Sequence, residues 1–224
     1  MMLPFPGGIE GLENATLIFS VLAGIFYIFL VDRDPSWARS VVKTLSTALL
    51  AWLAWMLRAP DLLVLGLALS ALGDLFLSRD GDKAFLGGLA SFLAAHIAYI
   101  VLFHRVGGGL DLIVAEPWRL ALAALVVVFA LAVLSILLRR VPPSLRIPVI
   151  AYSLTIMFMG VSALTLHNWM IIAGAAAFMA SDTLLGWERF VSPAISPNRQ
   201  MLRYSVWVLY YLAQLLITLG FVLS

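Results

Sequence analysis

The chain is a succession of apolar stretches, most of them about as long as a helix that crosses a lipid bilayer. The hydrocarbon layer is ~30 Å thick, and about 20 predominantly apolar residues span it as a helix. With 63% hydrophobic and only 12% charged residues, and a mean hydropathy of +1.04, the chain is too apolar for a water-soluble globular protein. The stretches lack the ~10-residue alternation of a membrane barrel. The sequence therefore predicts an all-α, polytopic membrane protein.

Charged residues, prolines and glycines divide these stretches into eight predicted transmembrane helices. They form one transmembrane domain, residues 1–224, and cover residues 14–31, 38–57, 61–78, 84–103, 118–138, 146–166, 168–187 and 203–223. The weakest break is His167-Asn168, inside an apolar run from 147 to 181 that is too long for one ordinary crossing. We expect a tight hairpin there.

Basic residues indicate how the helices are oriented. An even number of helices places both termini on one side, and loops rich in Lys and Arg tend to stay in the cytoplasm. One side has only Arg58, Arg105 and Arg119. The other side has Arg33, Arg39, Lys43, Arg79, Lys83, Arg139, Arg140, Arg146, Arg189, Arg199 and Arg203. We therefore expect an integral, multi-pass protein with both termini outside the cytoplasm, in the inner membrane if the source is a bacterium.

Several kinds of chemistry and partner find no support. There is no cysteine, which excludes disulfides and thiolate metal sites, and the three histidines show no HExxH-like spacing, so no metal is expected. No GxSxG elbow or phosphate-binding loop occurs. The pI of 9.2 reflects the topology signal, so no nucleic acid is implied. Glu10 and Glu13 stand where a basic leader is usual, and we expect no cleaved targeting segment.

Two aspartates lie inside predicted helices, where an ionised carboxylate is costly. Asp74 occurs in LALSALGDLFL and Asp182 in AAAFMASDTLL, and each precedes a charged helix end. We expect both in the cytoplasmic third of their helices, at one depth, and therefore in one site. Dry surroundings and a like-charged neighbour favour a protonated carboxyl group, so one of the two is expected to stay protonated at neutral pH. An acid beside a base is the arrangement of enzymes that cleave acetal-like C–O bonds.

The two aspartates also suggest an internal repeat. At an offset of 108 residues Asp74 aligns with Asp182, Leu77 with Leu185, and Pro35-Ser36 with Pro143-Ser144. This predicts two four-helix halves in parallel orientation. The structural alternative for each aspartate is a hydrogen bond between helices, or an ion pair with a cation such as Lys43.

Other polar residues within the predicted helices admit two interpretations. His96 and Tyr99 share one helix face, and Tyr210 and Gln214 form a polar stripe beside Tyr211. Tyr152 lies in the sixth predicted helix. Each of these side chains either lines a pocket or only bonds neighbouring helices together.

Taken together, the polar motifs resemble the YhhN-type lysoplasmalogenases. The resemblance runs from about Lys43 to Leu219 and rests on GDLFL (73–77), FLGGLASFLAAHIAYI (85–100), AYSLTIMFMGVSAL (151–164), SDTLLGWERF (181–190) and YYLAQLLI (210–217). It implies an eight-span membrane hydrolase without a cofactor. Its partners are then membrane lipid, a lysophospholipid substrate and water. The substrate is a lysoplasmalogen, and hydrolysis of its vinyl ether bond releases a fatty aldehyde and glycerophosphoethanolamine or glycerophosphocholine.

The resemblance also assigns residues. The family's essential acidic pair corresponds to Asp74 and Asp182 as catalytic residues, with the acid and base roles open between them. As a hypothesis, Lys43 with Arg79 or Arg189 holds the phosphate. The pocket is then shaped by His96, Tyr99, Tyr152, Tyr210, Tyr211 and Gln214.

Two other classes of function are compatible with the same residues. A proton-coupled transporter also uses paired membrane carboxyls, although few Gly or Pro residues interrupt these helices. A structural membrane protein would use the aspartates only to hold helices together. In that case, replacing them with asparagine would change stability and little else.

Overall fold

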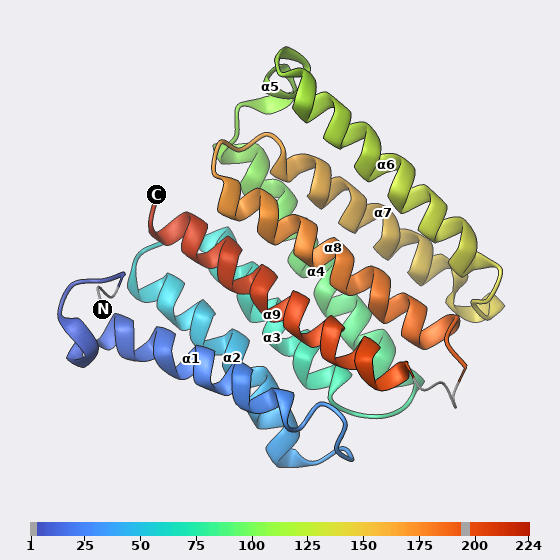
Figure 1. The fold of residues 1–224 in the computed structure, drawn as a ribbon, viewed down its shortest axis with the longest axis horizontal. Helices are drawn as coiled ribbons and strands as arrows, with labels where there is room; N and C mark the ends of the chain where they lie inside the picture. Colours follow the sequence, from blue (N-terminus) through green and yellow to red (C-terminus); the bar gives the residue numbers. More distant parts are fainter. Residues whose placement is uncertain (1–3, 194–197) are drawn as a thin grey trace.

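A computed structural model describes residues 4–193 and 198–224, and every regular element in these ranges is helical (Figure 1). Two 3₁₀ helices occur, η1 (Gly8–Glu10) and η2 (Pro143–Leu145). The α-helices within the described ranges are α1 (Leu12–Ile28), α2 (Trp37–Met56), α3 (Asp61–Leu77), α4 (Asp82–Val106), α5 (Gly109–Ala115), α6 (Pro117–Leu138), α7 (Arg146–Ala163), α8 (Trp169–Phe190) and α9 (Arg199–Val222).

The eight long helices overlap the eight predicted segments, and the all-α class is confirmed. The largest differences lie at helix ends: α9 begins at Arg199 and α1 ends at Ile28. Helix α5 was not predicted. It lies between the predicted helices 84–103 and 118–138, where Gly107, Gly108 and Gly109 would ordinarily indicate a loop, yet the third of these glycines begins the helix, with φ of +71°.

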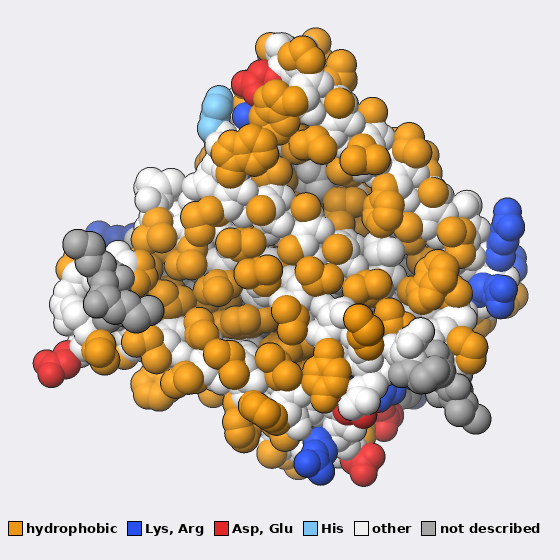
Figure 2. Space-filling model, in the orientation of Figure 1, with side chains coloured by type: hydrophobic (Ala, Val, Ile, Leu, Met, Phe, Trp, Pro, Cys, Tyr) orange, Lys and Arg blue, Asp and Glu red, His pale blue; other side chains and the backbone are white. Residues whose placement is uncertain are grey.

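Five helical segments in the described ranges are long and apolar enough to cross a membrane: α4, α6, residues 143–163, α8 and α9. Helix α1 is apolar but has 17 residues, about 26 Å at 1.5 Å per residue. Neither α2, which carries Arg39 and Lys43, nor α3 is among the five. That all eight long helices cross the membrane therefore stays a prediction. Figure 2 shows hydrophobic side chains over most of one face, with charged side chains at its edges.

The long helices run roughly along one direction, and within α1–α4 and within α6–α9 each long helix packs against its neighbours in sequence (Figure 1). The first four and the last four long helices meet where α4 packs on α7 and α2 packs on α9. The two contacts are equivalent: in each, the second helix of one group packs on the fourth helix of the other group. Two parallel four-helix halves would give these pairings.

The expected hairpin at His167-Asn168 is confirmed, since α7 ends at Ala163 and α8 begins at Trp169. Asn168 caps α8 by accepting from the amide of Met170 at 2.9 Å, and its amide donates to the Gly220 carbonyl at 2.8 Å. The buried Arg119 guanidinium donates to the carbonyls of Leu164 and Leu166, at 2.6 Å each. These bonds satisfy backbone groups that would otherwise be unpaired.

Glycines let α3 lie close to α4. A Cβ at Gly73 would lie 2.6 Å from the Phe92 ring, and one at Gly66 would lie 2.6 Å from the Tyr99 ring. Both distances are below van der Waals contact, so only glycine allows the two aromatic rings to pack on the α3 backbone. Gly73 directly precedes Asp74, and the close packing therefore fixes the part of α3 that carries this carboxyl group.

Candidate active site

A polar cavity of about 420 Å³ extends from the loops that precede α2 and α4, past the end of α8 and the start of α9, into the helix bundle. Asp74 and Asp182 both line it. Asp74 comes from α3 and Asp182 from α8, the third helix of each group of four. The structure thus brings the two sequence-predicted carboxyls to one cavity, which we call the polar cavity.

Asp74 is bonded to two neighbouring helices. Its side chain is 1% exposed, and its Oδ2 accepts from the Tyr210 hydroxyl of α9 at 2.6 Å and from Thr47 Oγ1 of α2 at 2.9 Å. Lys43 Nζ, one turn before Thr47, lies 3.4 Å from Oδ1. A buried carboxylate is expected to have such a cation and such donors. The Lys43 pair considered from the sequence is therefore present.

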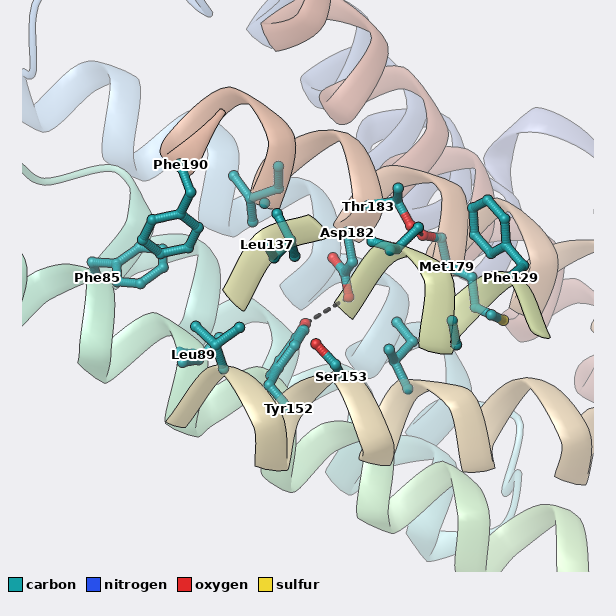
Figure 3. Close-up of a pocket in the computed structure, with 16 residues that line it drawn as sticks. Phe85, Leu89, Phe129, Leu137, Tyr152, Ser153, Met179, Asp182, Thr183 and Phe190 are labelled. Atoms are coloured by element: carbon teal, nitrogen blue, oxygen red, sulfur yellow. Dashed lines mark hydrogen bonds between the residues drawn. The ribbon is translucent and has the colours of Figure 1, made fainter. Parts of the chain in front are cut away.

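Asp182 has a different environment. Its Oδ2 accepts from the Tyr152 hydroxyl of α7 at 2.6 Å (Figure 3). His96 of α4 lies beyond hydrogen-bond distance, with its Nε2 3.8 Å from the same oxygen. Within the part of the chain that the structure describes, no lysine or arginine forms an ion pair with Asp182. The side chain is 10% exposed, so it is the more accessible carboxyl of the pair.

The two carboxyls nonetheless occupy related positions. Each accepts a hydroxyl from the second helix of its own group of four, Thr47 for Asp74 and Tyr152 for Asp182. Each also contacts the fourth helix of the other group, through Tyr210 or His96. The site therefore lies where the two groups meet.

A smaller apolar groove of about 70 Å³ adjoins Asp182 on its other side. Figure 3 shows Phe85 and Phe190 at one end of this groove and Phe129 and Met179 at the other, with the Asp182–Tyr152 bond between them. Asp182, Phe85 and Leu185 line the groove and also the polar cavity. Asp182 thus lies at the junction of a polar and an apolar space.

Arginines surround the outer part of the polar cavity. Arg189 bonds Asp82 at 2.8 Å, and Arg203 bonds Asp32 at 2.8 Å. In contrast, Arg39 Nε and Arg79 Nη2 are buried N–H groups without a hydrogen-bond partner among the described residues. The Arg79 guanidinium is stacked over the Trp37 ring at 3.9 Å, a contact that orients it. Arg39 and Arg79 therefore offer free donors to an anion, and Lys43 adds a positive charge that it shares with Asp74.

The structure separates the remaining predicted pocket residues from the cavity. Tyr99 donates to Gln214 Oε1 at 2.7 Å, and the Tyr211 hydroxyl lies 2.8 Å from Ser20 Oγ. Neither bond involves a residue that lines the polar cavity or the groove. His96 lines neither, but its Nε2 lies 3.8 Å from Asp182 and its ring packs edge-on against the Tyr152 ring at 5.4 Å. For Tyr99, Tyr211 and Gln214 the geometry favours the interpretation as bonds between helices.

Sequence reasoning missed Thr47, although its position four residues after Lys43 places both on one face of α2. It also missed Arg39 and Trp37, because basic and aromatic residues at a helix start are typical of any membrane helix end. The described residues include no group of three or more His, Asp or Glu side chains placed to hold a metal ion.

The fold and the site define an integral, multi-pass membrane protein with two carboxyls on one cavity. The YhhN family model matches residues 38–221, and the chain belongs to this family. Pig lysoplasmalogenase TMEM86B (Sus scrofa) is 34% identical over 90% of this chain and 83% of its own length. The human protein of that name is 30% identical, over 87% and 80%.

A lysoplasmalogenase from Mycobacterium tuberculosis is 35% identical over 71% of this chain and 59% of its own length. The similarity thus extends to a bacterial protein. All three relatives are named as enzymes, in agreement with the expectation of an enzyme. No solved structure matches the chain significantly.

Proposed function

We propose that this protein is a lysoplasmalogenase. It hydrolyses the vinyl ether bond of alkenyl lysophosphatidylethanolamine or lysophosphatidylcholine, giving a fatty aldehyde and the glycerophosphoethanolamine or glycerophosphocholine. The names of its relatives support the substrate class. The observation that carries the mechanism is the presence of Asp74 and Asp182 on one cavity, with Asp182 at its boundary with the apolar groove.

The partners of the two carboxyls support different roles. Lys43 beside Asp74 favours the charged form, so Asp74 acts as the carboxylate. Asp182, without a lysine or arginine partner in the described ranges, acts as the acid. Tyr152 occupies its Oδ2, which leaves Oδ1 to carry the proton that is transferred.

The reaction then proceeds in three steps. Asp182 gives its proton to the vinyl carbon beta to oxygen, and the π electrons form this C–H bond, leaving an oxocarbenium ion near the Asp74 carboxylate. Water adds to the oxygen-bearing carbon while Asp74 takes a proton from it. The hemiacetal hydroxyl then returns a proton to Asp182, the bond to glycerol oxygen breaks, and Asp74 protonates that oxygen. Both carboxyls regain their starting states, and one water is consumed.

The free donors of the polar cavity suit the phosphate of the substrate. Arg79 and Arg39 have buried N–H groups to offer, and Lys43, whose Nζ lies 3.4 Å from Asp74 Oδ1, lines the same cavity. Arg189, the alternative considered from the sequence, already binds Asp82. We therefore propose that Arg39 and Arg79 bind the substrate phosphate and that Lys43 lies nearer the ether oxygen.

Asparagine at either aspartate should slow hydrolysis strongly. Each proton-transfer role is worth typically 10²–10⁴-fold, so Asp74→Asn and Asp182→Asn should each release aldehyde from alkenyl lysophosphatidylethanolamine at least about 100-fold more slowly. The measurement is aldehyde formation by purified protein in detergent. The control is Asp61→Asn, at the exposed start of α3, which should match the wild type. Near-normal rates from a folded Asp182→Asn variant would leave the aspartates with a structural role only.

Neutralising Arg79 should weaken substrate binding more than catalysis. A hydrogen bond to a charged group contributes about 1.5–3 kcal/mol, so Arg79→Gln should raise KM about tenfold with a much smaller change in kcat. Steady-state kinetics measure both constants. Arg140→Gln serves as the matched control, because Arg140 is exposed and does not line the cavity. An equal KM in the two variants would contradict the phosphate assignment.

We also propose that all eight long helices cross the membrane with both termini outside the cytoplasm. Eleven basic residues gather at the end of the bundle where the polar cavity opens, and such residues favour the cytoplasm. In this orientation the cavity opens toward the cytoplasm.

Labelling of single cysteines tests this topology cleanly, because the chain has none of its own. Ser144 lies exposed between α6 and α7, and His167 lies exposed between α7 and α8. An impermeant maleimide should label His167→Cys in intact spheroplasts and Ser144→Cys only in inverted vesicles. Labelling of both from the same side would refute the proposed crossing of α7.

A further inference from the structure

The apolar groove beside Asp182 has no assigned role in the steps above. It lies between α6, α7 and α8, with Phe85 of α4 at one end. Most of its lining is aliphatic or aromatic, contributed by Leu89, Val133, Leu137, Val149, Ile156 and Met179. Its outer edge includes Phe129 of α6, which is 43% exposed on the outside of the bundle. The groove therefore connects the lipid-facing surface with a catalytic carboxyl.

We propose that this groove binds the hydrocarbon chain of the single-chain lipid substrate and that the chain enters it sideways between α6 and α8. This inference rests on the proposed function. An apolar surface in a membrane has no water to expel, so its apolarity alone names no occupant. The occupant is indicated by the continuity of the groove with the polar cavity, because Asp182, Phe85 and Leu185 line both spaces.

A molecule that fills both spaces must be amphipathic. Its charged end would lie among Arg39, Arg79 and Lys43, and its apolar end between α6 and α8. The bond that joins the two ends would then lie beside Asp182, at the junction. In an alkenyl lysolipid this bond is the vinyl ether, and the carbon that takes the proton is on its hydrocarbon side. The geometry therefore agrees with Asp182 as the proton donor.

Small residues make the groove narrow. A Cβ at Gly186 would lie 3.2 Å from Leu137 Cδ1. Ala130 of α6 lines the same groove, whereas Ala124, on the same helix, is exposed and does not. These two alanines offer a matched pair for filling the groove or leaving it open.

The first test compares Ala130→Phe with Ala124→Phe, using alkenyl lysophosphatidylethanolamines of eight to 18 carbons in the same detergent. Methylene groups in an apolar site each contribute to kcat/KM. Ala130→Phe should therefore lose roughly tenfold or more with the 18-carbon substrate and less than about twofold with the eight-carbon substrate. Ala124→Phe should behave as the wild type. An active Ala130→Phe variant whose chain-length profile equals that of the wild type would overturn the inference.

A second test does not require hydrolysis. An alkyl ether lysophosphatidylethanolamine, which lacks the reactive double bond, carries a photoactivatable diazirine in the middle of its chain. After irradiation, cross-links should map by mass spectrometry to the groove-lining parts of α6, α7 and α8, and Ala130→Phe should reduce them. Cross-links confined to other faces, such as α1 and α2, would refute the groove as the binding site. Cross-links in the groove without aldehyde from any alkenyl substrate would instead refute the proposed hydrolase alone.

Discussion

The site depends on the need of two buried carboxyls for donors from neighbouring helices. Asp74 obtains hydroxyls from α2 and α9, and Asp182 obtains one from α7 and faces His96 of α4. Unpartnered carboxyls in hydrocarbon surroundings are costly, so these contacts favour the arrangement in which α2 meets α9 and α4 meets α7. Two of the contacts that join the two groups of four helices, α2 with α9 and α4 with α7, therefore also build the site.

The difference between the two carboxyls follows from their surroundings. Lys43 accompanies Asp74 in a closed environment, whereas Asp182 is more exposed and has Tyr152 as its donor. Two aspartates at related positions thus have different partners, which supports the proposal that one acts as the acid and the other as the base. The polar cavity reaches the arginines at the bundle end, and the groove reaches the lipid-facing side of α6. A reaction at the bond between the head group and the chain of an amphipathic lipid requires a polar and an apolar surface that meet at that bond.

Much of this architecture is visible in the sequence, because charged and helix-breaking residues in an apolar chain mark helix ends clearly. The eight long helices and the hairpin at His167-Asn168 belong to this part. Asp74 and Asp182 stand out for the same reason, since carboxyls inside apolar helices are rare. Their place on one cavity follows from the similar distance of each to a charged helix end, while their catalytic role stays a prediction.

Other features depend on how each helix is rotated about its axis. A helix that is apolar on all sides has no hydrophobic periodicity from which this rotation could be predicted. Tyr99, Tyr211 and Gln214 have the same sequence character as Tyr210, yet only Tyr210 of these four reaches an aspartate. The groove is equally invisible, because its lining consists of residues that would suit any lipid-facing position. Helix α5 was missed since three successive glycines ordinarily indicate a loop.

The central claim is that a positioned carboxylic acid protonates the vinyl ether within the site. Hydrolysis by the wild-type protein in D₂O, with the aldehyde reduced at once to the alcohol, tests this claim most directly. The account predicts one deuterium on the carbon next to the carbinol carbon, in a single configuration, because Asp182 delivers it to one face of the double bond. Deuterium in equal amounts of both configurations would contradict the account, since it would mean that the proton is added in solution.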